Sequence, residues 1–108
     1  MTSSEHDAGR AVAELLPSRD ASGRTLRVSV ITRAGCHLCD RAVAAIDSTC
    51  VSLDDVGYAV VDIDDAAARD PRVRARYGEW VPVTFVDGAI HDYFTVDPSR
   101  LRERLSAS

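Results

Sequence analysis

Two cysteines separated by two residues lie between a strand pattern and a helix pattern, and this junction constrains the fold more than any other feature. Cys36 and Cys39 belong to the sequence CHLC. An alternating, β-branched run over residues 26–32 precedes them, and apolar side chains recur every three or four positions over residues 38–53. We therefore expect Cys36 at a strand-to-helix turn, at the N-terminus of the helix.

This position has a chemical consequence for Cys36. The first backbone N–H groups of a helix have no partner within it, and together with the helix dipole they favour an anion there. A thiolate is such an anion, and nearby cations favour it further. Arg33 and Arg41 flank the pair. We predict that Cys36 is a nucleophile and that Cys39, one turn into the helix, is its resolving partner.

The composition is that of one small globular domain. With 108 residues, 45% of them hydrophobic, the chain can form a modest core without disulfide bonds. A net charge of −4 argues against a nucleic-acid partner. No apolar run has the length of a membrane span, and the first residues do not resemble a signal peptide. We expect a cytoplasmic protein, in which a close cysteine pair is catalytic or metal-binding rather than structural.

The order of the predicted elements indicates an α/β fold. Residues 1–23 are predicted to be a flexible leader, with a short helix over 8–16 as the alternative, and residues 24–108 to be the domain. Within it we expect strands at 26–32, 58–63, 83–86 and 89–93, and helices at 38–53, 71–77 and 99–105. The Asp-Gly pair at 87–88 predicts a hairpin between the last two strands.

This order (β-α-β-α-β-β-α) is satisfied by a mixed four-stranded sheet flanked by helices. Asp70 and Pro71 are suited to begin the second helix, and Gly78 to end it. The carboxylates of Asp62, Asp64 and Asp65 are interpreted as a solvated strand end.

Three motifs at fixed places in this order carry a resemblance to a known family. They are the Cys36–Cys39 pair after the first strand, Val81-Pro82 before the third, and Val86-Asp87-Gly88 in the hairpin. Over residues 24–105 the chain resembles the glutaredoxin-like proteins of the thioredoxin-fold superfamily. Val81-Pro82 resembles the cis-proline site that faces the cysteine pair in that fold, and residues 93–97 resemble a small bacterial glutaredoxin-like subfamily.

The chain departs from the better-known members of this superfamily. His37 and Leu38 stand where glutaredoxins usually have Pro and Tyr. Residues 93–96 lack the paired glycines that help glutaredoxins to hold the carboxylate of glutathione. Gly35 and Val30 replace the tryptophan and the buried carboxylate of thioredoxins.

The resemblance implies a thioredoxin-like fold and a thiol–disulfide oxidoreductase. Arg33, His37, Val81 and Pro82 are then expected to contact the substrate, a disulfide-containing protein or a small thiol. No tightly bound cofactor is expected. A low-molecular-weight thiol (glutathione or mycothiol) or a thioredoxin-type reductase would be the reductant, and the protein is expected to be a monomer that binds neither nucleic acid nor membrane.

Several alternatives stay open at this level. His37 either tunes the Cys36 thiol or is an exposed spacer, and Trp80 either covers the site or packs in the core. A non-catalytic binding or redox-sensing module would keep the same fold. A zinc or iron–sulfur carrier would use the cysteine pair with His6 or His91. Cys50 lies about three helical turns from Cys39 and is expected to be an inert core residue.

Overall fold

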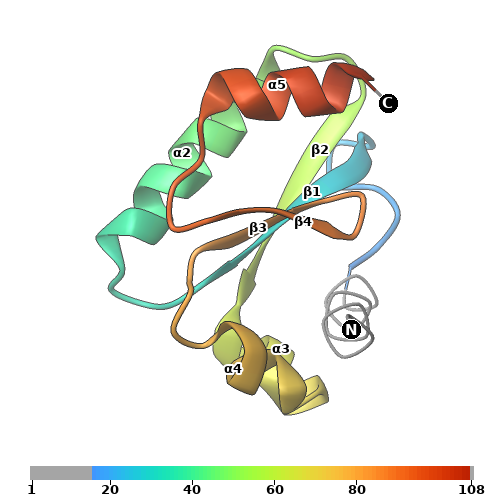
Figure 1. Ribbon diagram of the computed structural model, residues 1–108. Coiled ribbons are helices and arrows are strands. Elements are labelled where there is room, and N and C mark those ends of the chain that lie inside the picture. Colours follow the sequence, from blue (N-terminus) through green and yellow to red (C-terminus); the bar gives the residue numbers. More distant parts are fainter. Residues whose placement is uncertain (1–15, 108) are drawn as a thin grey trace.

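The computed structural model describes residues 16–107. These residues form a four-stranded sheet, and helices flank it (Figure 1). None of the helices within residues 16–107 combines the length and the apolar character of a membrane span. The elements are β1 (Thr25–Thr32), α2 (His37–Val51), β2 (Val56–Asp62), α3 (Ile63–Arg69), α4 (Arg72–Tyr77), β3 (Val83–Val86), β4 (Ala89–Tyr93) and α5 (Pro98–Ala107).

The sheet has the mixed arrangement that the sequence predicts. Its strand order is β2-β1-β3-β4. The β1–β2 pair is parallel, with Val30 opposite Val60, whereas β1–β3 and β3–β4 are antiparallel. Strand β1 is therefore central, and the loop that follows it leads directly to the cysteine pair.

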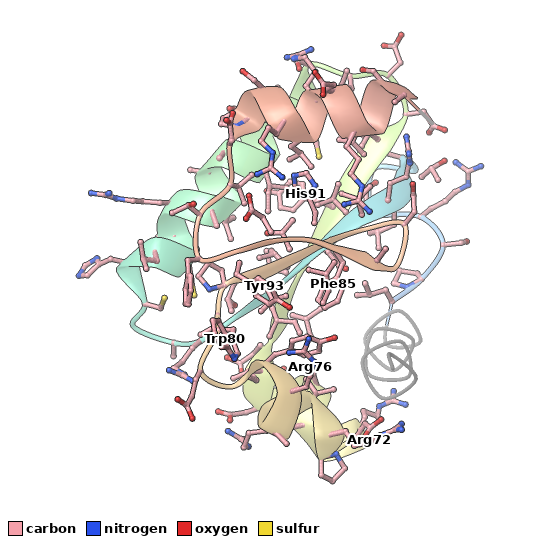
Figure 2. The ribbon with its side chains drawn as sticks, in the orientation of Figure 1. Arg72, Arg76, Trp80, Phe85, His91 and Tyr93 are labelled. Carbon is pink, nitrogen blue, oxygen red and sulfur yellow. The ribbon has the colours of Figure 1, made fainter. Side chains whose placement is uncertain are left out.

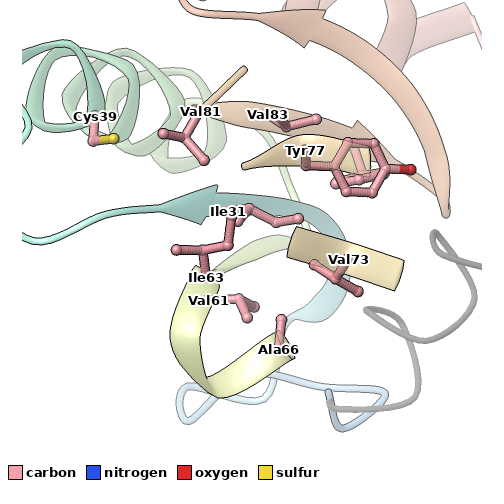
Figure 3. Packing of buried hydrophobic residues seen from close by; sticks show 10 residues of the cluster. Ile31, Cys39, Val61, Ile63, Ala66, Val73, Tyr77, Val81 and Val83 are labelled. Atoms are coloured by element: carbon pink, nitrogen blue, oxygen red, sulfur yellow. The ribbon is translucent and has the colours of Figure 1, made fainter. Parts of the chain in front are cut away.

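The two faces of the sheet carry separate hydrophobic clusters. Along β1, Val28 and Val30 point into a cluster beneath α2 and α5, while Ile31 points into a second cluster beside α3 and α4. This alternation is the two-residue period of a strand. Cys39 belongs to the second cluster, although it lies on α2, the helix that covers the first cluster. Figure 3 shows Cys39 among residues of the second cluster.

The sequence interpretation missed one helix. The sequence predicts a solvated acidic strand end at Asp62, Asp64 and Asp65, but residues 63–69 form the helix α3. Asp62 caps this helix, since its Oδ1 accepts the N–H of Asp64 over 2.8 Å, and Asp64 and Asp65 occupy its first turn, where carboxylates stabilise the helix dipole. The next helix, α4, begins at Arg72, one residue later than predicted, and Asp70 accepts the N–H of Arg72 over 3.0 Å.

Strand β2 begins two residues earlier than predicted, because a tertiary contact extends it. Gly57 pairs with Leu26 in the parallel ladder. A Cβ at this position would lie 2.4 Å from Oδ2 of Asp20. A side chain at position 57 would therefore require the Asp20 carboxylate to move.

The predicted hairpin is present between β3 and β4. Asp87 and Gly88 have φ of 53° and 84°, the left-handed values that a tight hairpin turn requires. The turn is held by Arg27 of β1, whose Nη2 lies 2.7 Å from Oδ2 of Asp87.

The described part of the predicted leader contacts the domain. Leu16 packs against the cluster beside α3 and α4, and Arg19 forms an isolated bridge with Thr25. The helix predicted at 8–16 lies, except for its last residue, outside the described residues. The boundary at residue 23 stays a prediction.

Candidate functional site

Cys36 caps the N-terminus of α2, as the sequence predicts. Its backbone is extended (φ −104°, ψ 112°), and its Sγ accepts the backbone N–H of Cys39 over 3.1 Å. The residue is half-buried, and the structure records all three cysteines as free thiols. The sulfur of Cys36 is therefore hydrogen-bonded to the N-terminus of α2, while its side chain is still partly accessible to solvent.

Cys39 is placed very differently from Cys36. It is only 2% exposed and packs with Val81 and Ile31 (Figure 3). Burial, then the hydrogen bond with Cys36 and the charges of Cys36 and Asp40, raise the pKa of Cys39 to about 11, against a smaller lowering by the backbone of Arg33. Cys39 is thus a protonated thiol at neutral pH, within one helical turn of the more accessible thiol of Cys36.

The loop between β1 and α2 is fixed by a turn and by one arginine. Gly35 has φ of 73°, a left-handed conformation that glycine adopts without steric cost. The guanidinium of Arg33 donates a hydrogen bond through Nη2 to the carbonyl of Gly78, at the end of α4. Arg33 therefore anchors this loop to the segment that leads to Val81 as well as bringing positive charge near the pair.

His37 is the first residue of α2 and is exposed. It makes no hydrogen bond or ion pair with the described residues, so its imidazole faces solvent next to Cys36. Arg41, one turn further along α2, is exposed as well. Both predicted neighbours thus lie at the surface.

Val81 and Pro82 come from the other side of the site. Their peptide bond is cis, as predicted, and both side chains are buried. Val81 packs in the cluster that contains Cys39 and against which Cys36 lies. The carbonyl of Pro82 accepts the N–H of Phe94 over 2.7 Å. This bond holds the segment after β4 against the loop before β3.

That bond brings together three aromatic residues, which we call the aromatic patch: Trp80, Tyr93 and Phe94. The ring of Trp80 lies 5.6 Å from that of Tyr93 and 5.6 Å from that of Phe94, centroid to centroid. Trp80 and Tyr93 are labelled in Figure 2. Trp80 is 47% exposed and Phe94 38%, so the patch is open to solvent. Of the two alternatives for Trp80, the structure therefore favours a surface position.

The sequence interpretation did not identify Phe94 as a site residue. Phe94 has φ of 67°, a conformation that L-residues other than Asn and Asp rarely adopt. Its signal in the sequence was the aromatic residue at the place where glutaredoxins carry paired glycines. Phe94 can be assigned to the site only when its contact with Pro82 is known, and the sequence alone does not reveal this contact.

A pocket of about 400 Å³ lies beside the cysteine pair, between the β1–α2 loop, α2 and β2. Cys39 and Asp40 line it from α2, Arg33 from the loop, and Val60 and Asp62 from β2. The pocket is therefore partly polar and borders the residue that carries the less accessible of the two thiols.

The remaining candidate residues lie away from this site. Cys50 is 2% exposed in the cluster beneath α2 and α5, as expected for a core residue. His91 lies on β4, and His6 is outside the described residues. Within residues 16–107 no group of three or more His, Cys, Asp or Glu side chains could hold a metal ion.

Comparison with known proteins identifies the family. Residues 27–106 match the glutaredoxin-like domain (DUF836). The chain belongs to this glutaredoxin-like family. "Uncharacterized protein Rv0508" of Mycobacterium tuberculosis is 35% identical over 83 residues, which cover 76% of this chain and 84% of that protein. "Uncharacterized protein Mb0520" of Mycobacterium bovis matches to the same extent.

Solved structures confirm the predicted thioredoxin-like fold. The target protein XcR50 from X. campestris superposes with a TM-score of 0.56 and 31% identity, covering 75% of this chain and 97% of that one. Fasciola hepatica thioredoxin covers 95% of this chain at a TM-score of 0.50 and 21% identity, with 92% of its own chain matched. Glutaredoxin C1 from Populus tremula x tremuloides covers 94% of this chain at 0.50 and 20%, with 89% of its own matched. A glutaredoxin-like thioredoxin fold with a close cysteine pair supports a redox-type function.

Proposed function

We propose that this glutaredoxin-like protein is a thiol–disulfide oxidoreductase with Cys36 as nucleophile and Cys39 as resolving thiol. The observation that carries the proposal is the asymmetry of the pair. Cys36 is a half-buried helix cap whose sulfur accepts an N–H, and Cys39 is a buried thiol one turn away. An exchange reaction requires one sulfur that attacks first and a second that waits beside it.

The cycle has two exchange steps. The Cys36 thiolate attacks one sulfur of a substrate disulfide, forms a mixed disulfide and releases the other substrate sulfur as a thiolate. Cys39, deprotonated, then attacks Cys36 Sγ, which releases the second substrate sulfur and leaves a Cys36–Cys39 disulfide. Two electrons have passed from the protein to the substrate.

The substrate is proposed to lie over the surface between α2 and the loop before β3. Cys36 lies against the hydrophobic cluster that contains Val81. The aromatic patch adjoins this segment, because Phe94 donates a hydrogen bond to the carbonyl of Pro82 and its ring lies beside that of Trp80. Exposed aromatic rings provide apolar contact area at low cost in side-chain entropy. His37 and Arg33 supply the polar edge. This surface fits a disulfide flanked by apolar groups.

The reducing partner follows from the same chemistry. A low-molecular-weight thiol, glutathione or mycothiol, or a thioredoxin-type reductase, is proposed to reduce the Cys36–Cys39 disulfide. No tightly bound cofactor takes part in this scheme. A reducing compartment such as the cytoplasm keeps the pair in the dithiol form that the first step needs, and the scheme needs only one copy of the chain.

A trapping experiment tests the proposal. Cys39→Ser should accumulate mixed disulfides with proteins of a cell lysate under non-reducing conditions, because the resolving thiol is gone. Cys36→Ser should accumulate none, and Cys50→Ser, the matched control, should accumulate no more than the unaltered protein. Adducts on Cys36→Ser but not on Cys39→Ser would reverse the roles. Adducts on neither variant would favour a non-catalytic binding or redox-sensing module.

A further inference from the structure

Strand β2 forms one edge of the sheet, and its outer side is available for pairing. The strand order is β2-β1-β3-β4, and within residues 16–107 no strand other than β1 pairs with β2. The edge of a sheet presents backbone N–H and C=O groups that can pair with another extended chain. Proteins usually protect such an edge with charged residues, proline or a bulge. Residues 56–61 of β2 (VGYAVV) contain no charge and no proline.

The two halves of this edge differ in how α2 covers them. Side chains alternate along a strand, so Tyr58, Val60 and Asp62 lie on the same face of β2, the face toward α2. The hydroxyl of Tyr58 donates a hydrogen bond to Oδ1 of Asp47 on α2 over 2.9 Å. Val60 is 49% exposed, although it lies in the interior of the strand. The C-terminal half of the edge is therefore the open half.

The pocket of about 400 Å³ beside the cysteine pair lies at this open half of the edge. Val60 and Asp62 line it from β2, and Asp40 and Val43 line it from α2. The pocket thus combines two apolar side chains with two carboxylates. A strand that pairs with the outer side of β2 places every second side chain on the face toward α2, where the pocket lies.

Both carboxylates of the pocket can accept further hydrogen bonds. Asp40 is exposed, and its carboxylate makes no hydrogen bond or ion pair with the part of the chain that the structure describes. Asp62 accepts the N–H of Asp64 through Oδ1 alone. An ionised carboxylate has about four acceptor positions, so each of the two has positions to spare. The guanidinium of Arg33, which also lines the pocket, is anchored to a backbone carbonyl of the next segment. The pocket therefore suits a basic side chain.

We propose that the outer side of β2 is a docking edge for an extended segment of another protein, in which a basic residue alternates with β-branched residues. The backbone of the segment pairs with residues 59–62 and adds a strand to the sheet. Its basic side chain enters the pocket and forms ion pairs with Asp40 and Asp62. The proposal goes beyond the proposed redox function and does not depend on it, because no thiol takes part.

The charges at this edge favour a basic partner over a second copy of the chain. In a parallel pair of two β2 strands, the Asp62 residues of both copies meet. In an antiparallel pair, Asp62 lies toward the acidic turn that precedes β2 in the other copy, formed by Asp54 and Asp55. Like charges that face one another across paired strands destabilise the pair. A basic segment meets attraction at the same positions.

Titration with short peptides tests the proposal. The peptides TVRVT and TVEVT, blocked at both ends, are added to reduced, isotope-labelled protein while NMR records the backbone amide shifts. TVRVT should shift the amides of residues 59–62 and of Asp40, and should bind about tenfold more tightly than TVEVT, whose glutamate meets like charges. The N–H groups of alternate residues point to opposite sides of a strand. N-methylation of both valines or of the arginine, but not of each set alike, should therefore abolish binding of TVRVT.

Substitutions in the protein locate the binding edge. Val60→Lys should weaken the binding of TVRVT about tenfold or more, because it removes an apolar contact and places a cation beside the arginine. Val51→Lys, the same change at an exposed position of α2 outside the pocket, should leave the affinity unaltered. Asp40→Asn and Asp62→Asn should each weaken binding about two- to fivefold, the range of exposed ion pairs. Glu103→Gln, an exposed charge change on α5, is their control.

Several outcomes would overturn the proposal. Equal affinities for TVRVT and TVEVT would show that the pocket does not select a basic side chain, and equal affinities of the two N-methylated peptides would exclude strand pairing. No shift at the highest soluble concentration would refute docking. Shifts confined to the aromatic patch would place the peptide on the proposed substrate surface instead. A concentration-dependent dimer that Val60→Lys abolishes would show that a second copy covers the edge. Should Val60→Lys not fold, the peptide pairs and the two asparagine variants decide the question.

Discussion

The backbone N–H of Cys39 donates a hydrogen bond to Sγ of Cys36 over 3.1 Å. The same two residues therefore interact through a backbone donor before any covalent bond joins their sulfurs. The donor is one of the first-turn N–H groups that a helix leaves unpaired. It stabilises negative charge on Cys36 and keeps Cys39 in place as the neighbouring thiol.

The first prediction concerns the order of thiol reactivity. At pH 7, iodoacetamide should label Cys36 at least tenfold faster than Cys39 in the reduced protein. Cys36 is half-buried at the helix terminus, whereas Cys39 is 2% exposed with a pKa of about 11, two units above the ordinary value of 9.0. Peptide mass spectrometry after short labelling times measures this. Labelling of Cys39 first would contradict the assignment of roles, and Cys36→Ser should show the slow rate alone.

The second prediction concerns the disulfide and Cys50. Air-oxidised protein should lose the mass of two hydrogens, and Cys39→Ser should prevent this loss while Cys50→Ser should not. Cys50 is buried in the opposite cluster, so a serine there places a hydroxyl in an apolar site. We expect Cys50→Ser to lower the free energy of unfolding by roughly 1–3 kcal/mol. Urea unfolding measures that change, and a Cys50→Ser protein that cannot oxidise would contradict the pairing.

The third prediction concerns the backbone of Phe94. Because its φ is 67°, Phe94→Gly should be more stable than Phe94→Ala by about 0.5–1 kcal/mol, although alanine keeps more of the side chain. Both variants lose the phenyl ring, so the difference between their free energies of unfolding reports the backbone conformation at position 94. The matched control is Thr95, which lacks a positive φ, and there the glycine variant should be the less stable of the pair. The same order at both positions would contradict the left-handed conformation of Phe94.

The fourth prediction concerns His91 and pH. Burial, followed by the charges of Arg104 and Arg100, lowers the pKa of His91, against a smaller effect of Asp92. Its Nδ1 lies 3.2 Å from Nη1 of Arg104, an arrangement that suits a neutral imidazole. The unfolded chain therefore binds a proton at His91 more readily than the folded protein does. The free energy of unfolding should fall as pH decreases from the ordinary histidine pKa of about 6.5 toward the lower pKa of His91 in the folded protein.

A comparison of two variants tests this sign. Denaturant unfolding between pH 7 and 5 should show a shallower loss of stability for His91→Gln than for the unaltered protein. His37→Gln, which replaces an exposed imidazole, is the matched control for the substitution itself. Parallel curves for His91→Gln and the unaltered protein would show that His91 titrates alike in both states.

Local chemistry in the sequence was sufficient for most of the fold. The alternation over 26–32 and the three-to-four spacing after Cys39 predicted β1 and α2, since each pattern reflects one buried face. Asp87-Gly88 predicted the hairpin because few other pairs adopt its φ values. Helix α3 was missed because only Ile63 and Ala66 are buried in it, too few to give a helical apolar pattern.

The position of Cys36 was also determined by the sequence, since a strand followed at once by a helix places the intervening residue at a helix terminus. The aromatic patch was not. Trp80 and Phe94 lie on different segments, and they meet only because the β3–β4 hairpin folds back and Phe94 donates to the carbonyl of Pro82.

The surroundings of Cys39 were decided by tertiary structure alone. Its burial depends on Val81 and on β1, and the pocket beside it exists because α2 and β2 bring Asp40 and Asp62 to opposite walls. The residue types in the Cys36–Cys39 segment determine which groups can react. Which thiol is accessible depends on distances between segments that the chain order leaves open.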